Sequence, residues 1–387
     1  MCIRDAFLKI LLSSMCVSAS VAATSVAAEE KAREIKCVKR GTGPEPPRAA
    51  MPAPRAQDGR IQAPEAASKL KPVCPEGETP ELAAPSDRHF LKGNPMLRSY
   101  AAPGPARPLP GEFVNRNLLM PFDQVYWKRD GQVSPPPPPN RPHGSGDPPC
   151  DGVAWFGSCF YYGTASEQVV ADGGGMTLQI EAPVVAAGDP EGHSIGEIAV
   201  MGAGGAGGSL DDVEMGFSVS PGQWGDNAPH LFVYHWNDGN ETCYNSCDWH
   251  QYSNTYYPGM DLTALVGKFV YIGWVQYEGA WWGWFNDQWL GYIDNSAFST
   301  KFAKTAQIQW YGEVASDVGI PPQTQMGDGE FPAQKTAAGM QTLCYVDAKA
   351  WVCFYNDGQS AGATDTTYYD IQNHTSYGAV RYGGSGQ

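Results

Sequence analysis

Two stretches in the second half of the chain alternate apolar and polar residues with the period of a β-strand. In VEMGFSV, residues 213–219, every odd-numbered residue is apolar, and Glu214 lies on the opposite face. In AQIQWYGEV, residues 306–314, Gln309, Tyr311 and Glu313 share the polar face. A glutamate in mid-strand is more often an ordinary solvated residue than a functional one. Two such strands, distant in sequence, nevertheless make Glu214 and Glu313 the residues to explain.

The same short-strand pattern continues from residue 153 to the C-terminal region, and helical periodicity is nearly absent. Regularly spaced short strands, separated by Gly, Asn, Asp and Pro, are typical of an all-β sandwich or barrel. We expect strands at residues 155–164, 176–182, 195–201, 213–219, 230–236, 269–277, 280–285, 289–293, 306–311, 340–347 and 351–355.

Composition divides the chain into four parts. Residues 1–28 have the apolar core and small-residue end of a secretory signal peptide, and residues 29–130 are rich in proline, alanine and charge, which predicts a low-order pro-region. Residues 131–149 form a Pro/Gly-rich linker, and residues 150–387 form the β-domain. We therefore expect a secreted or periplasmic protein with no membrane anchor.

Charge separates the leader from the β-domain. Residues 1–149 hold 20 Lys and Arg against 15 Asp and Glu, whereas the remaining residues hold 6 against 26. A basic leader beside a strongly acidic domain is consistent with a pro-region that docks electrostatically and loosens as carboxylates protonate. The acidic balance argues against nucleic acid as a partner.

Eight cysteines follow the predicted signal peptide, and they occur as sequence neighbours. An even number of cysteines in an exported chain indicates disulfides. We expect four local pairs: Cys37–Cys74, Cys150–Cys159, Cys243–Cys247 and Cys344–Cys353. The alternative, a metal site at Cys243 and Cys247 near His250, lacks a second cysteine pair at ligand spacing.

Common catalytic motifs are missing from the sequence. It contains no G-x-S-x-G and no H-E-x-x-H, and no cysteine remains for a thiol nucleophile if all four pairs form. Carboxylates are left as the candidate catalytic groups, and we expect no metal and no other cofactor.

Several separate motifs resemble the neprosin family of secreted glutamic peptidases. They are GFSVSPGQWGDNAPHLFVYHW, ETCYNSC, WWGWFNDQWLGYI, IQWYGEV and TQMGDGEFP, and the resemblance extends over about residues 152–387. It implies an antiparallel β-sandwich of two large sheets, with a concave cleft that holds two catalytic glutamates. It also implies a zymogen with an inhibitory pro-region and cleavage after proline at acidic pH.

Placed motif by motif, the resemblance assigns the two catalytic roles to Glu214 and Glu313. Plant members tend to carry a further glutamate where this chain has Gln309. Two neighbouring glutamates share a proton, so one can activate water while the other protonates the leaving amine. Gln309 and Tyr311 are candidates to stabilise the oxyanion.

Aromatic residues supply candidate substrate contacts. Trp274, Trp282 and Trp284 are possible apolar walls for a proline ring, although a core position is the commoner role for such residues. The expected partners are proline-containing protein or peptide substrates and the chain's own pro-region.

Two other functions fit the residues without the family resemblance. Paired carboxylates with tryptophans also describe a retaining glycoside hydrolase. A lectin-like binding module needs the aromatic residues but not the two glutamates.

Overall fold

The computed structural model describes residues 35–55, 70–82, 152–155, 158–189, 192–202, 211–237, 240–316, 320–355, 360–373 and 378–387. The predicted signal peptide, the predicted linker and its boundary with the β-domain lie outside these residues. Among the described residues, no helix is long and apolar enough to cross a membrane.

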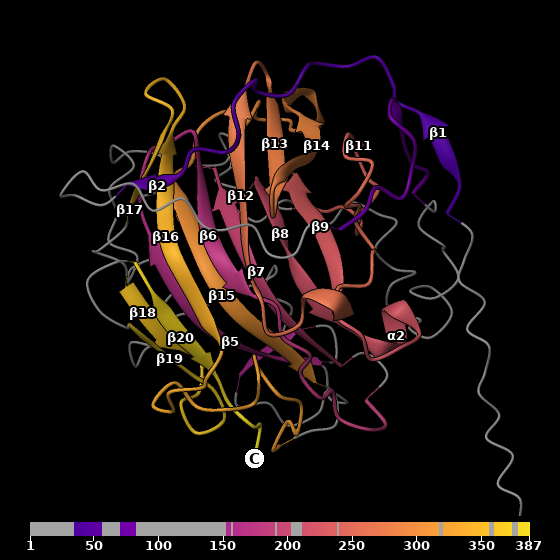
Figure 1. Cartoon of the computed structure of the whole chain (residues 1–387). Coiled ribbons are helices and arrows are strands. Elements are labelled where there is room, and N and C mark those ends of the chain that lie inside the picture. Colours follow the sequence, from indigo (N-terminus) through magenta and orange to yellow (C-terminus); the bar gives the residue numbers. More distant parts are fainter. Residues whose placement is uncertain are drawn as a thin grey trace, which may run out of the picture. The chain divides into compact units, whose positions relative to one another are not determined.

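Most described strands belong to two large sheets (Figure 1). One sheet has eight described strands in the order β10-β9-β8-β7-β15-β5-β18, with β4 paired to β5. Their bounds are β4 Val153–Trp155, β5 Ser158–Glu167, β7 His193–Met201, β8 Asp212–Val219, β9 His230–Asn237, β10 Asn240–Glu241, β15 Gln307–Ser316 and β18 Ser360–Ala363.

The other sheet has ten described strands, in the order β11-β14-β13-β12-β6-β16-β17-β2, with β20 pairing both β16 and β19. Their bounds are β2 Pro54–Arg55, β6 Gly173–Gln179, β11 Trp249–Gln251, β12 Phe269–Tyr277, β13 Ala280–Phe285, β14 Gln288–Asp294, β16 Gly339–Asp347, β17 Val352–Tyr355, β19 Asp370–Asn373 and β20 Val380–Gly383. The pairing of β2 with β17 is parallel, whereas the neighbouring β16–β17 pair is antiparallel.

Smaller elements complete the described structure. A two-stranded sheet pairs β1 (Cys37–Lys39) with β3 (Glu78–Pro80). The described helices are single turns: α2 (Pro221–Trp224), η3 (Thr263–Leu265) and η4 (Asn295–Ala297). The expected all-β, antiparallel sandwich is therefore confirmed.

The main core fills the space between the two sheets. Met215 of β8, Ile272 and Trp274 of β12 and Trp310 of β15 are fully buried in one cluster. Trp310 Nε1 donates a hydrogen bond of 3.1 Å to the Gly175 carbonyl of β6, so a side chain of one sheet bonds the backbone of the other. Because these strands alternate, the residues between the core positions lie on the outer faces of the sheets.

The periodic pattern located the central strands well. The strands predicted at 269–277 and 280–285 coincide with β12 and β13, and the turn at Asn286 has a positive φ of 58°. The strand predicted to end at residue 311 continues to Ser316 and therefore includes Glu313. Strands β18, β19 and β20 were not predicted, because these short segments lack a long alternating run.

Three of the four predicted disulfides are confirmed: Cys37–Cys74, Cys243–Cys247 and Cys344–Cys353. Cys150 lies outside the described residues, so the pair with Cys159 stays a prediction. Because Cys243 is bonded to Cys247, the alternative metal site there is wrong.

The prediction of low order for residues 29–130 is wrong for two stretches, residues 35–55 and 70–82. Composition suggested that they bury little, yet Met51 and Cys74 are each only 4% exposed. Met51 is buried in a cluster with aromatic side chains of the ten-stranded sheet, which a composition count of the leader alone does not include.

Candidate active site

The outer face of the eight-stranded sheet carries both predicted catalytic glutamates. We call the residues Glu197, Glu214, Gln309, Tyr311 and Glu313 the acidic face. They lie on the three adjacent strands β8, β7 and β15, on the side that faces away from the core. The sequence alternation had placed Glu214 and Glu313 on such a face correctly.

Glu214 and Gln309 occupy the same level of the sheet. Ala199 of β7 is paired with Glu214 of β8 on one side and with Gln309 of β15 on the other. Only the methyl group of Ala199 stands between them on this face. The strand spacing puts the Glu214 and Gln309 backbones about 10 Å apart, a gap that two long side chains can span.

Glu313 lies at a different level. It pairs with Ile195 of β7, and Ile195 pairs in turn with Ser218 of β8. Glu214 and Glu313 are therefore two strands and four residues apart, which corresponds to about 16 Å between Cα atoms in a flat sheet. The two glutamates share one face, but their backbones are not directly opposite each other.

A third glutamate, Glu197 of β7, lies between the two. It pairs with Gly216 on β8 and with Tyr311 on β15, and it is only 2% exposed. Burial raises the pKa of Glu197 well above its usual value, and the charges of Glu214 and Glu313 raise it further, while a hydrogen bond from Tyr311 opposes the shift. Sequence reasoning missed Glu197, although it carries the same signal as Glu214, a carboxylate in mid-strand.

Space beside Glu197 depends on a glycine. A Cβ at position 216 would lie 2.0 Å from the Gly196 carbonyl oxygen and 2.7 Å from the Glu197 Cβ. Because such contacts are too short, any larger residue at Gly216 would displace β7 or the Glu197 side chain.

The environment of Glu214 favours its protonated form. Burial raises the pKa of Glu214 to about 8, and the charge of Glu313 adds to the rise, while hydrogen bonds with Trp236 and Asp212 oppose it. A carboxyl group with this pKa keeps its proton at acidic and neutral pH, so Glu214 is suited to act as a general acid.

Glu313 is held by two hydrogen-bond donors. His193 Nε2 lies 2.8 Å from Glu313 Oε1, and the Tyr162 hydroxyl also bonds this carboxylate. Both donors stabilise a negative charge on Glu313. His193 and Tyr162 were not predicted as site residues, because only the pairing of β5, β7 and β15 brings them to Glu313.

Gln309 has unmet hydrogen-bonding capacity. Its side chain is fully buried, and neither Oε1 nor Nε2 has a partner among the described residues. An unpaired buried polar group costs about 1–3 kcal/mol. Such an amide, on the level of Glu214, is available to bond a substrate oxygen.

The three tryptophans predicted as possible apolar walls for a proline ring lie on the ten-stranded sheet, whereas Glu214 and Glu313 lie on the eight-stranded sheet. Trp274 is in the core between the sheets. Trp282 and Trp284 belong to a cluster on the outer face of the ten-stranded sheet. Strand alternation alone does not reveal which sheet a strand joins.

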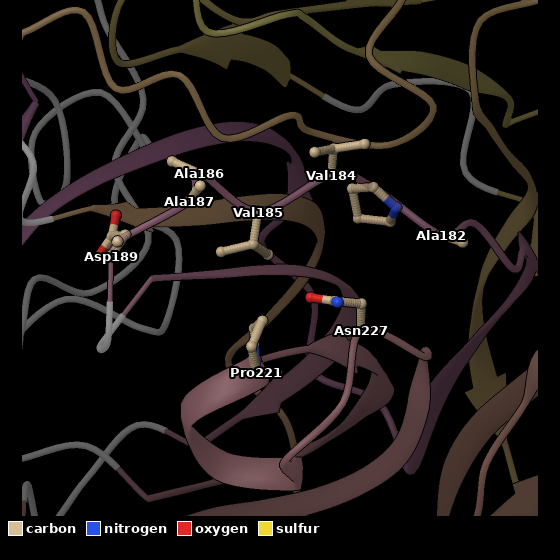
Figure 2. A pocket seen from close by; sticks show the side chains of 10 residues that line it. Ala182, Val184, Val185, Ala186, Ala187, Asp189, Pro221 and Asn227 are labelled. Atoms are coloured by element: carbon tan, nitrogen blue, oxygen red, sulfur yellow. The ribbon is translucent and has the colours of Figure 1, made fainter. Parts of the chain in front are cut away.

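A pocket of about 680 Å³ lies between the segment that precedes β7 and the residues that follow β8 (Figure 2). Residues 182–189, which precede β7, form one wall with mostly apolar side chains, and Pro221 and Asn227, which follow β8, contribute from the other side. The pocket edge is fixed by Asp189, whose carboxylate accepts a 2.8 Å hydrogen bond from Ser316 Oγ at the end of β15.

No group of three or more His, Cys, Asp or Glu among the described residues is arranged to hold a metal ion. His250, considered for such a site, lies 3.3 Å from Asp294 and stacks on Tyr292.

Comparison with known proteins identifies a family. Residues 190–385 match the family model described as Neprosin. Among solved structures, the chain is similar to Scytalido-glutamic peptidase with a peptide-based transition state analog, at 8% identity and a TM-score of 0.33, over 58% of this chain and 97% of that chain. It is also similar to a Bacillus licheniformis β-glucanase, at 7% identity and a TM-score of 0.26, over 42% of this chain and 66% of that chain. These low TM-scores carry no argument about activity.

Proposed function

The chain belongs to the neprosin family, and from that premise we propose that it is an exported glutamic endopeptidase whose reaction takes place on the acidic face. The observation that carries the proposal is the group of three glutamates on adjacent strands, with the buried and unpaired amide of Gln309 opposite Glu214. Family membership supports a peptidase, and the geometry suggests a role for each residue.

In the proposed reaction, Glu313 is the general base and Glu214 the general acid. Glu313, which is hydrogen-bonded to His193 and Tyr162, takes a proton from a water molecule that attacks the peptide carbonyl. Glu214, whose pKa is about 8, gives its proton to the leaving amine. Because the two glutamates are offset along their strands, the water molecule and the scissile bond would lie between them, over Glu197.

Gln309 is proposed to stabilise the oxyanion. Its Nε2 group can donate to the carbonyl oxygen as negative charge develops there, and a fixed donor in a buried site is worth about 3–4 kcal/mol in the transition state. Burial raises the pKa of Glu197 well above its usual value, which favours the neutral form, and that form is proposed as a second donor.

The finer parts of the family resemblance are also proposals. The apolar pocket bounded by residues 182–189 and Pro221 has the chemistry to hold a proline ring, which would give cleavage after proline. Disulfides form in oxidising compartments, so the three that are described support a secreted or periplasmic protein. Synthesis as a zymogen remains an expectation from the leader.

Cleavage of a short proline-containing peptide by acid-treated protein tests the proposal, with wild type, Glu214→Gln and Glu313→Gln compared across pH 2 to 8. We expect cleavage after proline by the wild type, loss of cleavage in both variants and normal activity in Glu278→Gln. Glu278 is a matched control because it is an exposed glutamate in the β12–β13 turn of the other sheet.

Two outcomes would overturn the assignment. Full activity in Glu313→Gln, with loss in Glu214→Gln, would remove Glu313 from the reaction. An intact peptide together with cleavage of a β-glucan by the same wild-type protein would indicate a glycoside hydrolase.

A further inference from the structure

The outer face of the ten-stranded sheet is as distinctive as the acidic face. We call the cluster of Tyr271, Trp282, Trp284, Trp289 and Tyr292 the aromatic face. Each of these side chains is 7% exposed or less, although all point away from the core between the sheets. Met51 belongs to the same buried cluster. It lies in residues 35–55, which we call the N-terminal segment.

Ring donors of the ten-stranded sheet bind the backbone of the N-terminal segment. Trp289 Nε1 lies 3.1 Å from the carbonyl oxygens of both Pro47 and Ala49. Trp351 Nε1 donates a 3.0 Å hydrogen bond to the Ala50 carbonyl. The next hydrogen bond along the segment, made by Tyr271, also has a backbone carbonyl oxygen as its acceptor.

The Tyr271 hydroxyl donates a 2.8 Å hydrogen bond to the Pro52 carbonyl. The acceptors of these hydrogen bonds are main-chain carbonyl oxygens, which every residue has. No backbone N–H of the segment takes part in them. Proline lacks that N–H, so it can occupy these positions without loss of a hydrogen bond.

Met51 fills a hole made by two glycines. Gly175 of β6 and Gly273 of β12 are directly paired. A Cβ at either position would lie 2.9 Å or 2.3 Å, respectively, from the Met51 methyl carbon. The missing side chains therefore create the space that this methionine occupies.

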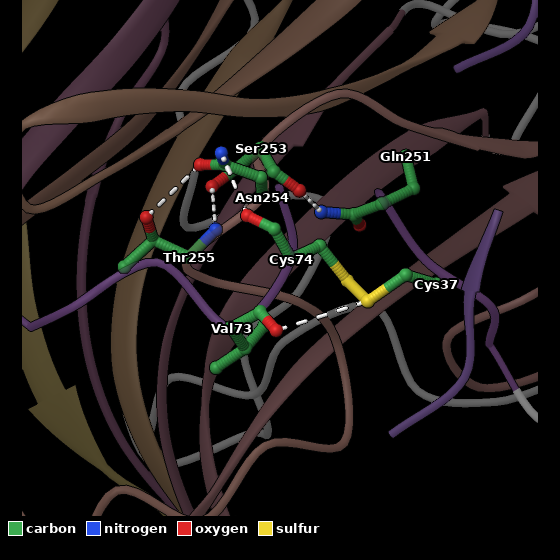
Figure 3. Close-up of a disulfide and its surroundings, with 7 residues drawn as sticks. All are labelled: Cys37, Val73, Cys74, Gln251, Ser253, Asn254 and Thr255. Atoms are coloured by element: carbon green, nitrogen blue, oxygen red, sulfur yellow. Dashed lines mark hydrogen bonds between the residues drawn. A yellow bond between two sulfur atoms is a disulfide. The ribbon is translucent and has the colours of Figure 1, made fainter. Parts of the chain in front are cut away.

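Two further features fix the ends of the segment. Its C-terminal end forms β2, which adds to the edge of the ten-stranded sheet by parallel pairing with β17 (Figure 1). Its N-terminal end is tied by the Cys37–Cys74 disulfide. Asn254 Nδ2 donates to the Cys74 carbonyl (Figure 3). The Asn254 carbonyl accepts hydrogen bonds from the amides of Val73 and Cys74.

We propose that the aromatic face is a binding site for proline-rich polypeptide, which residues 42–55 occupy in cis. The sequence TGPEPPRAAMPAPR contains five prolines in 14 residues. Aromatic surfaces whose ring N–H and hydroxyl groups bind carbonyl oxygens are a recurrent way of recognising proline-rich segments, because such segments are already extended and lose little entropy on binding.

A proline-rich segment of another protein presents the same groups and would compete for the same face. Trp282 Nε1 is buried without a partner among the described residues, so the face has a further donor to offer. The site is on the opposite sheet from the acidic face, and binding there does not require catalysis.

The test measures binding of a fluorescent peptide of residues 42–55 to the full chain carrying Glu214→Gln, which is meant to prevent cleavage. We expect weak binding to this parent, because its own segment occupies the face. Met51→Ala weakens the cis contact, and Cys37→Ser with Cys74→Ser releases the disulfide. Each change should strengthen peptide binding at least tenfold, and either suffices if the other variant does not fold.

Matched variants then locate the site. In the Met51→Ala protein, Trp289→Phe keeps an aromatic ring but removes the N–H donor, and it should weaken binding about tenfold. Trp224→Phe is the control, since this partly exposed tryptophan lies on α2, outside the aromatic face. A peptide with all five prolines changed to alanine should bind at least tenfold more weakly.

The proposal is overturned if neither cis-weakening variant gains affinity, if Trp289→Phe and Trp224→Phe behave alike, or if the alanine peptide binds as well as the proline peptide. A failure of the peptidase assay leaves each of these binding results unchanged, so the two proposals are tested separately.

Discussion

The two outer faces of the sandwich differ in how their polar groups are satisfied. On the acidic face, the Gln309 amide and one Glu197 oxygen are buried without a hydrogen-bond partner among the described residues. On the aromatic face, Trp282 Nε1 also lacks a partner among the described residues, but Trp289 Nε1 and the Tyr271 hydroxyl bind carbonyl oxygens of the N-terminal segment. The first face carries unpaired polar groups suited to a reacting substrate, whereas the second is already occupied by a peptide.

From this difference we expect a catalytic role for the acidic face and a binding role for the aromatic face. Carboxyl groups with raised pKa values are costly to bury and are retained where a reaction needs them. Aromatic side chains gain free energy when they are covered, and their donors can be met by any extended backbone. Variants of the acidic face should therefore change activity more than stability, and variants of the aromatic face should do the reverse.

The largest expected effect is on catalysis by Glu214→Gln. Loss of the proton donor should lower kcat/KM for a proline-containing peptide by a factor of about 10² to 10⁴. Thermal unfolding at pH 5 should stay close to wild type, because glutamine resembles the protonated carboxyl group. A large drop in melting temperature without loss of activity per folded molecule would contradict this division of roles.

Gln309→Ala should have the next largest effect. Removal of one oxyanion donor lowers kcat by a factor of about 10² to 10³, with KM little changed. Because the amide has no partner among the described residues, its removal should not destabilise the fold through a lost hydrogen bond. Steady-state kinetics and thermal unfolding of the same preparation distinguish this result from a loss of structure.

Stability should depend on pH in the direction opposite to that of most proteins. Burial raises the pKa of Glu214 to about 8 and that of Glu181 to about 7, both above the ordinary value of 4.5. The folded state thus binds more protons than the unfolded chain, and this stabilisation is complete below pH 4.5 and is lost as pH rises to about 8. As pH rises between the unfolded and the folded pKa, each group lowers the free energy of unfolding by up to about 1.4 kcal/mol per pH unit.

Denaturant unfolding at pH 4.5, 6 and 8 measures this dependence. We expect wild type to be most stable at pH 4.5 and Glu214→Gln to show a shallower decline. Equal stability at the three pH values would mean that these carboxyl groups are not protonated in the folded protein. In the peptidase assay, the same Glu214 proton should make activity fall as pH rises through about 8.

Trp289→Phe should have the smallest effect. The variant loses the hydrogen bonds to Pro47 and Ala49 and replaces the indole with a smaller phenyl ring. The lost hydrogen bonds alone should lower the free energy of unfolding by about 0.5–1.5 kcal/mol. Cleavage of a short peptide should be unchanged, because the residue lies on the other sheet. A tenfold loss of kcat/KM in this variant would show that the two faces are coupled.

Sequence patterns predicted part of the candidate site. Alternation placed Glu214 and Glu313 on the outer face of their strands, because side-chain direction along a strand is a local property. It did not indicate that Glu197 lies between them, that Gln309 rather than Glu313 is level with Glu214, or that His193 bonds Glu313. Those relations depend on the order and register of strands that are distant in the chain.

By itself, the sequence determined the fold class, the central strands, three disulfides and the family, because these follow from local periodicity, the order of the cysteines along the chain and contiguous motifs. Only the tertiary structure decided which strands are neighbours and therefore what each face does. Trp282 and Trp284, which we expected to contact substrate, lie on the other sheet, and Met51 of the proline-rich segment is buried beside them. The physical reason is that strand order and register arise from non-local contacts, which no short stretch of sequence specifies alone.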